Sequence, residues 1–387
     1  LAGVGVCGPI VTLLSSFASL VGLGGSPIMA MRMGEGRDRE AGRVLSNSFL
    51  MLLILSGVLT TLFLLLKEHL LMWFGASDAT FGYANTYLTI YTAGTFFALM
   101  ATGMNSFLIA QGFSGLGMAT VMLGAVLNII LDPIFIFGLH LDVAGAALAT
   151  VLSQMASCAF VLLSLRRKRM PVRLRWGRME LHIVRRVLAF GLSPFLIIAT
   201  DSILLIVLNT VLQRYGGPEL GDTLVTCATI AQSFMLVVTM PLDGIAAGTA
   251  SILGYNLGAG QPKRILEAQK YTLLLSLAYT TTLCLMGLLL AAPFTHIFTP
   301  DPQISALAVT VIRIFSIGVI PLAVQYTIVE GLNGMGMMQF SLPLSFFRKA
   351  VYFAALFTLP ATFGAASTFW AEPISDLIPP LVTALFY

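Results

Sequence analysis

Charged residues are scarce in this 387-residue sequence. Asp, Glu, Lys and Arg make up 10% of it, whereas a water-soluble domain has about 25%. Hydrophobic residues make up 57%, and one stretch without any charge covers residues 79–131, which exceeds two bilayer crossings at about 20 residues each. This composition excludes a water-soluble α/β or all-β protein, and the chain is predicted to be a membrane protein.

Cysteine and histidine are also few, and neither forms a chemical motif. The four cysteines lie singly in apolar stretches, which leaves no CxxC metal site and no disulfide framework. The four histidines are scattered, and the sequence has no HExxH, GxSxG or Walker-type GxxxxGK[ST] motif. We therefore expect neither an enzyme nor a cofactor.

Long apolar runs dominate the sequence instead. They are about 20 residues long and do not alternate apolar with polar residues, which favours transmembrane helices over barrel strands. The fold class is therefore an all-α polytopic membrane protein. Eleven helices are predicted, over residues 4–31, 46–66, 85–110, 118–138, 144–165, 190–211, 223–252, 272–292, 305–330, 341–361 and 366–387.

The basic residues fall mainly on one side of this predicted topology. When the loops are assigned to alternate sides, 18 of the 21 Lys and Arg residues share one side, including Arg348 and Lys349. By the positive-inside rule the rich side is cytoplasmic. The basic character therefore follows from topology in the cytoplasmic membrane, and no nucleic-acid partner is expected.

The chain contains an internal repeat. Residues 22–36 align with residues 246–260 at a shift of 224, with glycine at three equivalent positions. Residues 111–118 align with residues 330–337 at a shift of 219. Two alignments in the same order and at nearly the same shift indicate a duplicated helical unit.

This duplication predicts an N-terminal lobe over residues 1–165 and a C-terminal lobe over residues 190–387, joined by a basic, solvated cytoplasmic linker over residues 166–189. At the same shift, the helix around Asp201 has its equivalent before Leu1, so the first helix of the N-terminal lobe is expected to be missing from this chain. With it, each lobe has six helices and both lobes have the same orientation. Parallel repeats of this kind occur in secondary transporters, where the substrate binds between the halves.

The most informative polar residues lie in the sequence Asn128-Ile-Ile-Leu-Asp132-Pro133. A carboxylate at the bilayer centre costs roughly 2.5–3.5 kcal/mol, so Asp132 requires an explanation. The i,i+4 spacing places Asn128 and Asp132 on one helix face, and Pro133 frees a backbone carbonyl. Thr150 and Gln154, also four apart, lie on the next predicted helix. These oxygens suit Na⁺ or a proton; the alternative is a proline kink in which Asp132 stabilises the bundle.

Asp201 is a second intramembrane acid, predicted near the middle of its helix. Asn209 follows two turns later on the same face. A substrate-binding or proton-binding role and a purely structural pair are both open for these residues.

For four further acids a structural role is favoured. Asp243 follows a proline, where a broken helix would bury it. Glu330 is expected to pair with Arg348 or Lys349 at the cytoplasmic rim. Glu372 and Asp376 align with Thr150 and Gln154 at a shift of 222 and form either a second polar cluster or part of the outer interface.

Several short motifs, taken together and in order, resemble those of the MATE (multidrug and toxic compound extrusion) antiporters of the MOP superfamily. The resemblance spans nearly the whole chain. The motifs are Met33-Gly-Glu-Gly36, Asn256-Leu-Gly-Ala-Gly260, Asn128-xxx-Asp132-Pro133, Gly145-Ala-Ala-Leu-Ala-Thr150 and Trp370-Ala-Glu-Pro-Ile-Ser375.

The resemblance implies twelve helices in two six-helix lobes, Na⁺ or H⁺ antiport, and export of cationic amphiphiles. It implies a cation site in the N-terminal lobe, where an acid of the missing first helix joins Asn128, Asp132 and Thr150. It also matches Asp201 to the acid of the family's seventh helix. Some members carry a mid-membrane Asp on the tenth helix, whereas this sequence has Val319 and Pro321 there, which disfavours a similar site in the C-terminal lobe.

The sequence thus predicts a monomeric, cation-coupled antiporter that exports lipophilic, often cationic compounds by alternating access. Two alternatives remain. A lipid-linked saccharide flippase of the same superfamily would need a cationic central cavity to bind pyrophosphate. A membrane-embedded enzyme would need dispersed acids to converge on a metal ion.

Overall fold

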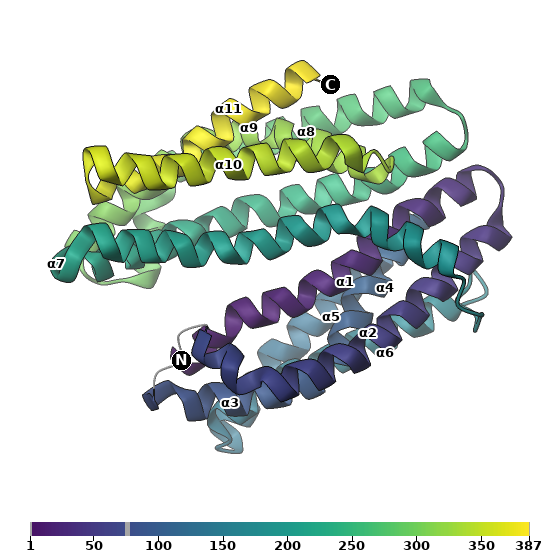
Figure 1. Ribbon diagram of the computed structural model, residues 1–387, viewed down its shortest axis with the longest axis horizontal. Coiled ribbons are helices and arrows are strands. Elements are labelled where there is room, and N and C mark those ends of the chain that lie inside the picture. The colour runs from purple at the N-terminus through teal and green to yellow at the C-terminus, as the bar shows by residue number, and fades with distance from the viewer. Residues whose placement is uncertain (1, 74–77, 387) are drawn as a thin grey trace. The chain divides into compact units, whose positions relative to one another are not determined.

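Helices make up almost all of the chain in the computed structural model, which describes residues 2–73 and 78–386 and shows no strand among them (Figure 1). Leu1 and Tyr387, at which the predicted lobes begin and end, lie outside the described residues. The helices are α1 (Ala2–Gly34), α2 (Asp38–Trp73), α3 (Asp78–Ala93), α4 (Thr95–Ala110), α5 (Ser114–Pro133), the π-helix η1 (Ile134–Gly138), α6 (Asp142–Arg166), α7 (Leu181–Gly258), α8 (Pro262–Phe298), α9 (Pro302–Gly334), α10 (Met338–Phe363), the 3₁₀ helix η2 (Ala365–Trp370) and α11 (Ala371–Phe386).

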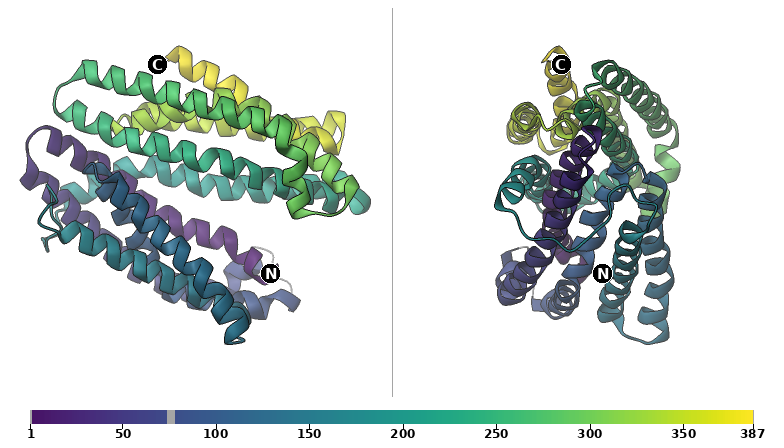
Figure 2. Two further views of the ribbon diagram at one scale, coloured as in Figure 1. Left: turned by 180° about the vertical axis from the view of Figure 1, so that it is seen from behind. Right: turned by 90° about the vertical axis from the view of Figure 1, so that its right-hand side faces the viewer.

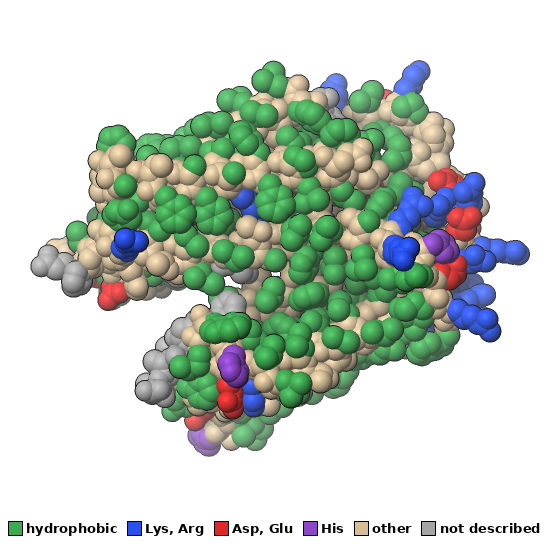
Figure 3. Space-filling view, in the orientation of Figure 1, with side chains coloured by type: hydrophobic (Ala, Val, Ile, Leu, Met, Phe, Trp, Pro, Cys, Tyr) green, Lys and Arg blue, Asp and Glu red, His purple; other side chains and the backbone are tan. Residues whose placement is uncertain are grey.

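Most of these helices are long and apolar enough to cross a bilayer. Over residues 2–73 and 78–386, nine helices meet this criterion, and the bent pair Phe81–Ala93 and Thr95–Ala110 is a tenth if it forms one span. Large hydrophobic side chains are exposed along the helix flanks, while charged side chains gather near helix ends (Figure 3). The predicted all-α, multi-pass membrane fold is confirmed.

The helix predicted over residues 85–110 is instead two helices, α3 and α4, bent by 56° at Gly94. Val151 of α6 packs against this bend, and a Cβ at Gly94 would lie 2.6 Å from its Cγ2 atom. The glycine therefore lets α6 approach the bend, a packing requirement that hydropathy does not reveal.

Several helices extend beyond the predicted spans. α2 begins at Asp38 rather than at residue 46, and α8 covers Pro262–Phe298 rather than residues 272–292. Asp38 and Glu40 in the first turn of α2 favour helix formation there because acids stabilise the positive end of the helix dipole. Hydropathy detects only the apolar part of each helix, so the charged ends were missed.

The predicted linker is partly helical. α7 begins at Leu181, so the non-helical connector covers only residues 167–180. Met170, Val172 and Leu174 are buried and the residues between them are exposed. This alternation shows an extended segment in which three side chains pack on the helices, while most of the connector is exposed.

α7 is interrupted once. At Gly217 the backbone has φ 64° and ψ −168°, which separates the apolar helices Leu181–Gly217 and Leu220–Gly258. Glycine suits this position because it adopts positive φ without steric cost.

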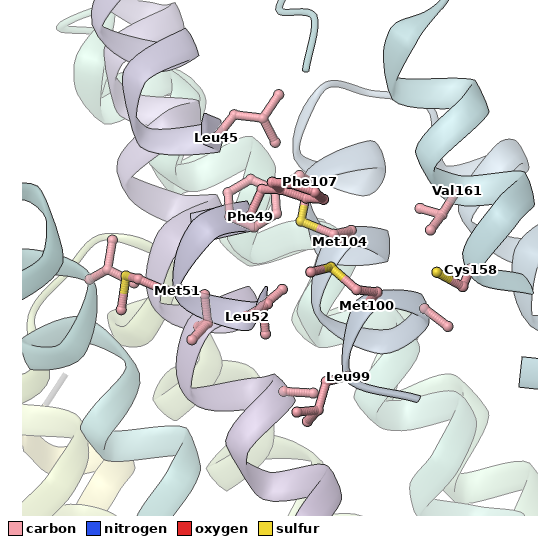
Figure 4. Close-up of a cluster of buried hydrophobic side chains, with 14 of the residues drawn as sticks. Leu45, Phe49, Met51, Leu52, Leu99, Met100, Met104, Phe107, Cys158 and Val161 are labelled. Atoms are coloured by element: carbon pink, nitrogen blue, oxygen red, sulfur yellow. The ribbon is translucent and has the colours of Figure 1, made fainter. Parts of the chain in front are cut away.

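The chain divides into two compact units. Unit 1 consists of Leu1–Ser202 and Gly254–Gly260, and unit 2 of Ile203–Leu253 and Gln261–Tyr387. In unit 1, α1, α2, α4 and α6 lie beside one another (Figures 1 and 2). Figure 4 shows their shared core, where side chains of α2, α4 and α6 such as Leu52, Met104 and Val161 meet. In unit 2, buried side chains of α7 to α11 form a second core around Phe234 and Phe315.

Glycines allow the closest helix crossings in unit 1. A Cβ at Gly191 of α7 would collide with the backbone carbonyl of Leu20 of α1. A second crossing joins the repeat-equivalent Gly34 and Gly258, whose added Cβ atoms would collide with the carbonyls of Tyr255 and Met31 respectively. One of the three glycine pairs aligned by the internal repeat therefore meets in a reciprocal contact.

Candidate functional site

The backbone changes form immediately after Asp132. α5 ends at Pro133 and continues as the π-helical turn Ile134–Gly138, a type of turn that occurs frequently at functional sites. Gly145 of α6 packs against this turn, and a Cβ there would lie 2.8 Å from the carbonyl carbon of Phe135. The Asp132-Pro133 and Gly145 motifs therefore bring α5 and α6 together.

Asn128, Asp132 and Thr150 lie together at this contact. The Asn128 amide Nδ2 donates to Asp132 Oδ1 at 3.4 Å and to Thr150 Oγ1 at 3.5 Å. The Thr150 hydroxyl in turn donates to the Ala146 carbonyl at 2.9 Å. The structure thus joins the three residues that the sequence assigned to the coupling cation, and their function stays a prediction.

Two tyrosines of α3 extend this polar cluster. Gln154 Nε2 donates to the Tyr91 phenol at 3.4 Å, and the Tyr87 phenol lies beside Thr150. The rings of Tyr87 and Tyr91 stack, with centroids 6.1 Å apart. The Gln154 Oε1 atom is buried and has no hydrogen-bond partner among the described residues, so it is an unused acceptor of this cluster. Sequence analysis missed both tyrosines, although their i,i+4 spacing places them on one helix face.

Asp132 is half-buried and has no basic partner within 4.0 Å among the described residues. An exposed apolar stripe of α5 is formed by the side chains of Met122, Val126 and Ile129. Asp132 therefore lies beside this apolar stripe, against α6, and its charge is not neutralised by a permanent salt bridge.

These oxygens suit a small cation or a proton. A carboxylate, an amide and a hydroxyl are hard ligands of the type that Na⁺ prefers. The Asn128 amide presents its nitrogen to Asp132 and Thr150. Na⁺ would require the opposite orientation, with Oδ1 directed at the ion, whereas a proton on Asp132 would not.

Two of the other predicted candidates, Asp201 and Asp243, are more exposed than Asp132. Asp201 is exposed on α7 and Asn209 is half-buried. Asp243 is also exposed, and α7 is helical from Met240 through Gly244, so the predicted break in the helix that would bury it is absent there. The roles of Asp201 and Asn209 stay predictions.

Unit 2 contains a separate buried ion cluster. Arg348 of α10 donates from Nε to Asp376 Oδ1 of α11 at 2.8 Å, and its Nη2 lies 2.7 Å from the same oxygen. Glu372 Oε1 lies 3.7 Å from Nη2. The Asp376 side chain is fully buried, and its Oδ2 has no hydrogen-bond partner in the described part of the chain. One guanidinium is therefore held by two carboxylates.

The structure differs from the sequence-based prediction for Arg348, Lys349 and Glu330. Arg348 and Lys349 do not lie on a solvated rim: Lys349 is 5% exposed, and Arg348 pairs within unit 2. Glu330 accepts a hydrogen bond from Asn333 at 3.3 Å, and no ion pair between Glu330 and Arg348 is present in the described part of the chain. The sequence did contain a signal for this cluster. The i,i+4 spacing places Glu372 and Asp376 on one helix face, and two acids inside a membrane need a basic partner on a neighbouring helix.

The fold and these clusters define a class of protein. Apolar helices that carry half-buried and buried polar clusters are typical of secondary transporters, in which intramembrane ionisable residues mark ion and substrate paths. Within residues 2–73 and 78–386, no group of three or more His, Cys, Asp or Glu residues is placed to hold a metal ion.

Comparison with known proteins identifies the family. The MatE family profile matches residues 1–134 and 197–375, and the chain belongs to the MatE family. Membership in this family makes it a transporter and not an enzyme.

Known relatives agree with this assignment. The chain is 25% identical to the multidrug export protein MepA of Staphylococcus haemolyticus (strain JCSC1435), over 96% of this chain and 81% of that protein. It is 24% identical to a FAD transporter of Shewanella oneidensis, over 98% of this chain and 84% of that protein. Among solved structures, the outward-facing conformation of a multidrug resistance MATE family transporter of the MOP superfamily matches with a TM-score of 0.93 and 25% identity, over 100% of this chain and 86% of that chain.

Proposed function

We propose that this protein is a cation-coupled multidrug efflux transporter of the cytoplasmic membrane, which acts as a monomer and works by alternating access. Asp132 binds the coupling ion, Na⁺ or H⁺, and Asn128 and Thr150 orient its carboxylate. The observation that carries this proposal is the half-buried Asp132 carboxylate, which has an amide donor but no basic partner among the described residues. An intramembrane carboxylate in that state gains most from binding a cation.

Ion binding at Asp132 would change the cluster around it. A proton or Na⁺ on Asp132 removes the negative charge that the Asn128 amide faces at 3.4 Å. The amide then loses its charge-assisted acceptor, and its contact with Thr150 of α6 is free to rearrange. The π-helical turn Ile134–Gly138 directly follows Asp132-Pro133 and contacts Gly145 of α6. A rearrangement at Asp132 can therefore be transmitted to α6 through this turn.

Lipophilic cations are the favoured cargo. The relatives include multidrug export proteins, and the 18 Met and 26 Phe residues supply polarizable and aromatic surfaces that accept such compounds. The flippase alternative and the FAD-transporting relative would favour an anionic cargo. Against that reading, the half-buried guanidinium of Arg348 faces two carboxylates and offers no uncompensated positive charge.

Transport by purified protein tests the proposal. The full-length protein is reconstituted in proteoliposomes, and ethidium transport is measured under an imposed Na⁺ gradient and, separately, an imposed pH gradient. Asp132→Asn should reduce gradient-driven transport to the level of empty liposomes, because the neutral amide cannot exchange the ion. Asp222→Asn, which removes an exposed acid of α7, is the matched control and should transport as the unaltered protein does.

Two results would contradict the proposal. If Asp132→Asn retained ion-driven ethidium transport, the coupling site would be elsewhere. If FAD were transported and ethidium were not, the cargo would be anionic. The gradient that drives wild-type transport identifies the coupling ion.

A further inference from the structure

A cavity at the basic end of unit 1 contains more positive charge than its own residues neutralise. It has a volume of about 540 Å³ and lies between the first turns of α2 and the connector over residues 167–180. Five arginines and two acids line it, which leaves an excess of three positive charges. These residues are Arg39, Arg43, Arg173, Arg175, Arg178, Asp38 and Glu180.

Most of these arginines lack an ion-pair partner. Arg43 lies 3.8 Å from Glu180, and Arg173 donates to the backbone carbonyl of Lys168 at 3.0 Å. Across the described part of the chain, Arg39, Arg175 and Arg178 have no carboxylate within 4.0 Å. All five arginines are exposed, so their charges are available to a ligand.

Buried hydrogen bonds hold the connector in this position. The Ser46 hydroxyl donates to the Arg175 carbonyl at 2.7 Å. The Asn47 amide donates to the Arg178 carbonyl at 3.3 Å and accepts from the Glu180 amide at 2.7 Å. Ser46 and Asn47 are 6% and 1% exposed, respectively. The cavity is therefore a built feature of unit 1, and its arginines are presented by a fixed backbone.

A smaller, partly apolar cavity adjoins the basic one. It has a volume of about 270 Å³, shares Arg175 and Trp176 with the larger cavity, and is also lined by Phe49, Leu174 and Arg166. The Trp176 ring is 71% exposed and meets the Phe49 ring edge-on, with centroids 5.5 Å apart. A ligand that spans both cavities therefore needs an anionic part and an apolar part.

The position of Trp176 places these cavities at the membrane interface. Phe49 is one helical turn from Leu53 and Ile54, the first large apolar side chains of α2 that are exposed to the surroundings. Tryptophan is enriched at the level of the lipid headgroups, with its ring between apolar and polar layers. Basic pockets at this level bind the headgroups of acidic lipids.

We propose that these two cavities form a binding site for an acidic glycerophospholipid of the adjacent leaflet. The phosphate lies among Arg173, Arg175 and Arg178, and the start of an acyl chain lies along Trp176 and Phe49. This inference does not depend on the coupling mechanism, because none of these residues belongs to the Asp132 cluster. An inorganic anion would neutralise the arginines, but it would make no apolar contact with Phe49, Leu174 and Trp176 in the smaller cavity.

Lipid retention tests this proposal. The purified full-length protein is titrated with phosphatidylglycerol or phosphatidylcholine in detergent, and bound lipid is counted by native mass spectrometry. The unaltered protein should bind phosphatidylglycerol preferentially. The variant R173Q/R175Q/R178Q should bind it roughly 150-fold more weakly, because each of the three basic residues near a lipid surface contributes about 1 kcal/mol.

A charge-matched variant controls for net charge. K263Q/R264Q/K270Q removes three exposed positive charges of α8 and should leave phosphatidylglycerol binding unchanged. Trp176→Ala should weaken binding of phosphatidylglycerol but not of inorganic phosphate, which separates a lipid from a free anion. All variants are compared with the unaltered protein by melting temperature.

Three outcomes would overturn the proposal. The first is equal phosphatidylglycerol binding by the unaltered protein and R173Q/R175Q/R178Q. The second is an equal loss in the α8 control. The third is displacement of phosphatidylglycerol by inorganic phosphate at a concentration equal to that of the lipid. This result would show that the site binds free anions. None of these outcomes bears on ion-coupled transport.

Discussion

The guanidinium of Arg348 is fixed against the carboxylate of Asp376 by two contacts to one oxygen, from Nε at 2.8 Å and from Nη2 at 2.7 Å. The Asp376 side chain is fully buried and the Arg348 side chain is 20% exposed. Because little water reaches this pair, the charge of each side chain is stabilised mainly by the charge of the other.

Removal of the arginine charge should destabilise unit 2. We expect Arg348→Gln to lower the free energy of unfolding by about 3–5 kcal/mol, because it leaves the buried Asp376 carboxylate without its cation. Thermal unfolding of the detergent-solubilised protein measures this loss. Arg313→Gln, at an exposed position of α9, is the matched control and should unfold at the same temperature as the unaltered protein. Equal melting temperatures for both variants would show that the ion pair does not stabilise the fold.

The contact between α1 and α7 should tolerate no side chain larger than hydrogen at Gly191. An added methyl group would meet the Leu20 carbonyl, which is backbone and cannot rotate away. We expect Gly191→Ala to destabilise the protein by about 1–3 kcal/mol or more, as overpacking does. Gly57→Ala, in the interior of α2 with no atom near the added group, should be neutral or stabilising by about 0.5–1 kcal/mol. If both variants melted together, the close approach would not be required.

The sequence predicted the helices, the repeat and the main cluster because each leaves a local signal. Apolar length marks a span, and the spacing of Asn128, Asp132 and Pro133 marks one helix face. The contact of this face with Thr150 followed from the position of the next helix. Hydropathy predicted the helix ends less accurately, because charged turns that extend beyond the apolar part of a helix are still helical.

The sequence did not predict the position of Arg348, because the positive-inside rule assigns every basic residue to a loop side. A half-buried arginine departs from that rule when carboxylates on another helix compensate its charge, and only tertiary packing shows whether they do. The sequence did not predict the packing of the connector for a similar reason. Its backbone is held by Ser46 and Asn47, which lie over a hundred residues away in sequence.

Loss of the Asn47 side chain should loosen the connector. Asn47→Ala removes the acceptor of the Glu180 amide and the donor to the Arg178 carbonyl. A lost hydrogen bond of about 1 kcal/mol raises the population of the open connector roughly fivefold, and cleavage of an open segment follows that population. Limited trypsin digestion should therefore cut after the connector arginines at least that much faster. Thr226→Ala, which removes a hydroxyl bonded only within its own helix, should be cut at the original rate; equal rates for both variants would contradict the anchoring role of Asn47.

The Thr150 hydroxyl should tune ion binding without controlling the fold. It accepts from Asn128 at 3.5 Å and lies beside Tyr87, so Thr150→Val keeps the shape of the side chain and removes one polar partner of the Asp132 cluster. A hydrogen bond contributes about 0.5–1.5 kcal/mol, which corresponds to a roughly 2- to 13-fold rise in the ion concentration for half-maximal ethidium transport. Thr150→Ser retains the hydroxyl and should restore the original ion dependence, although it lacks the methyl group. If Val and Ser gave the same ion dependence, the hydroxyl would play no part in coupling, and a change in maximal rate alone would assign Thr150 to packing between α5 and α6.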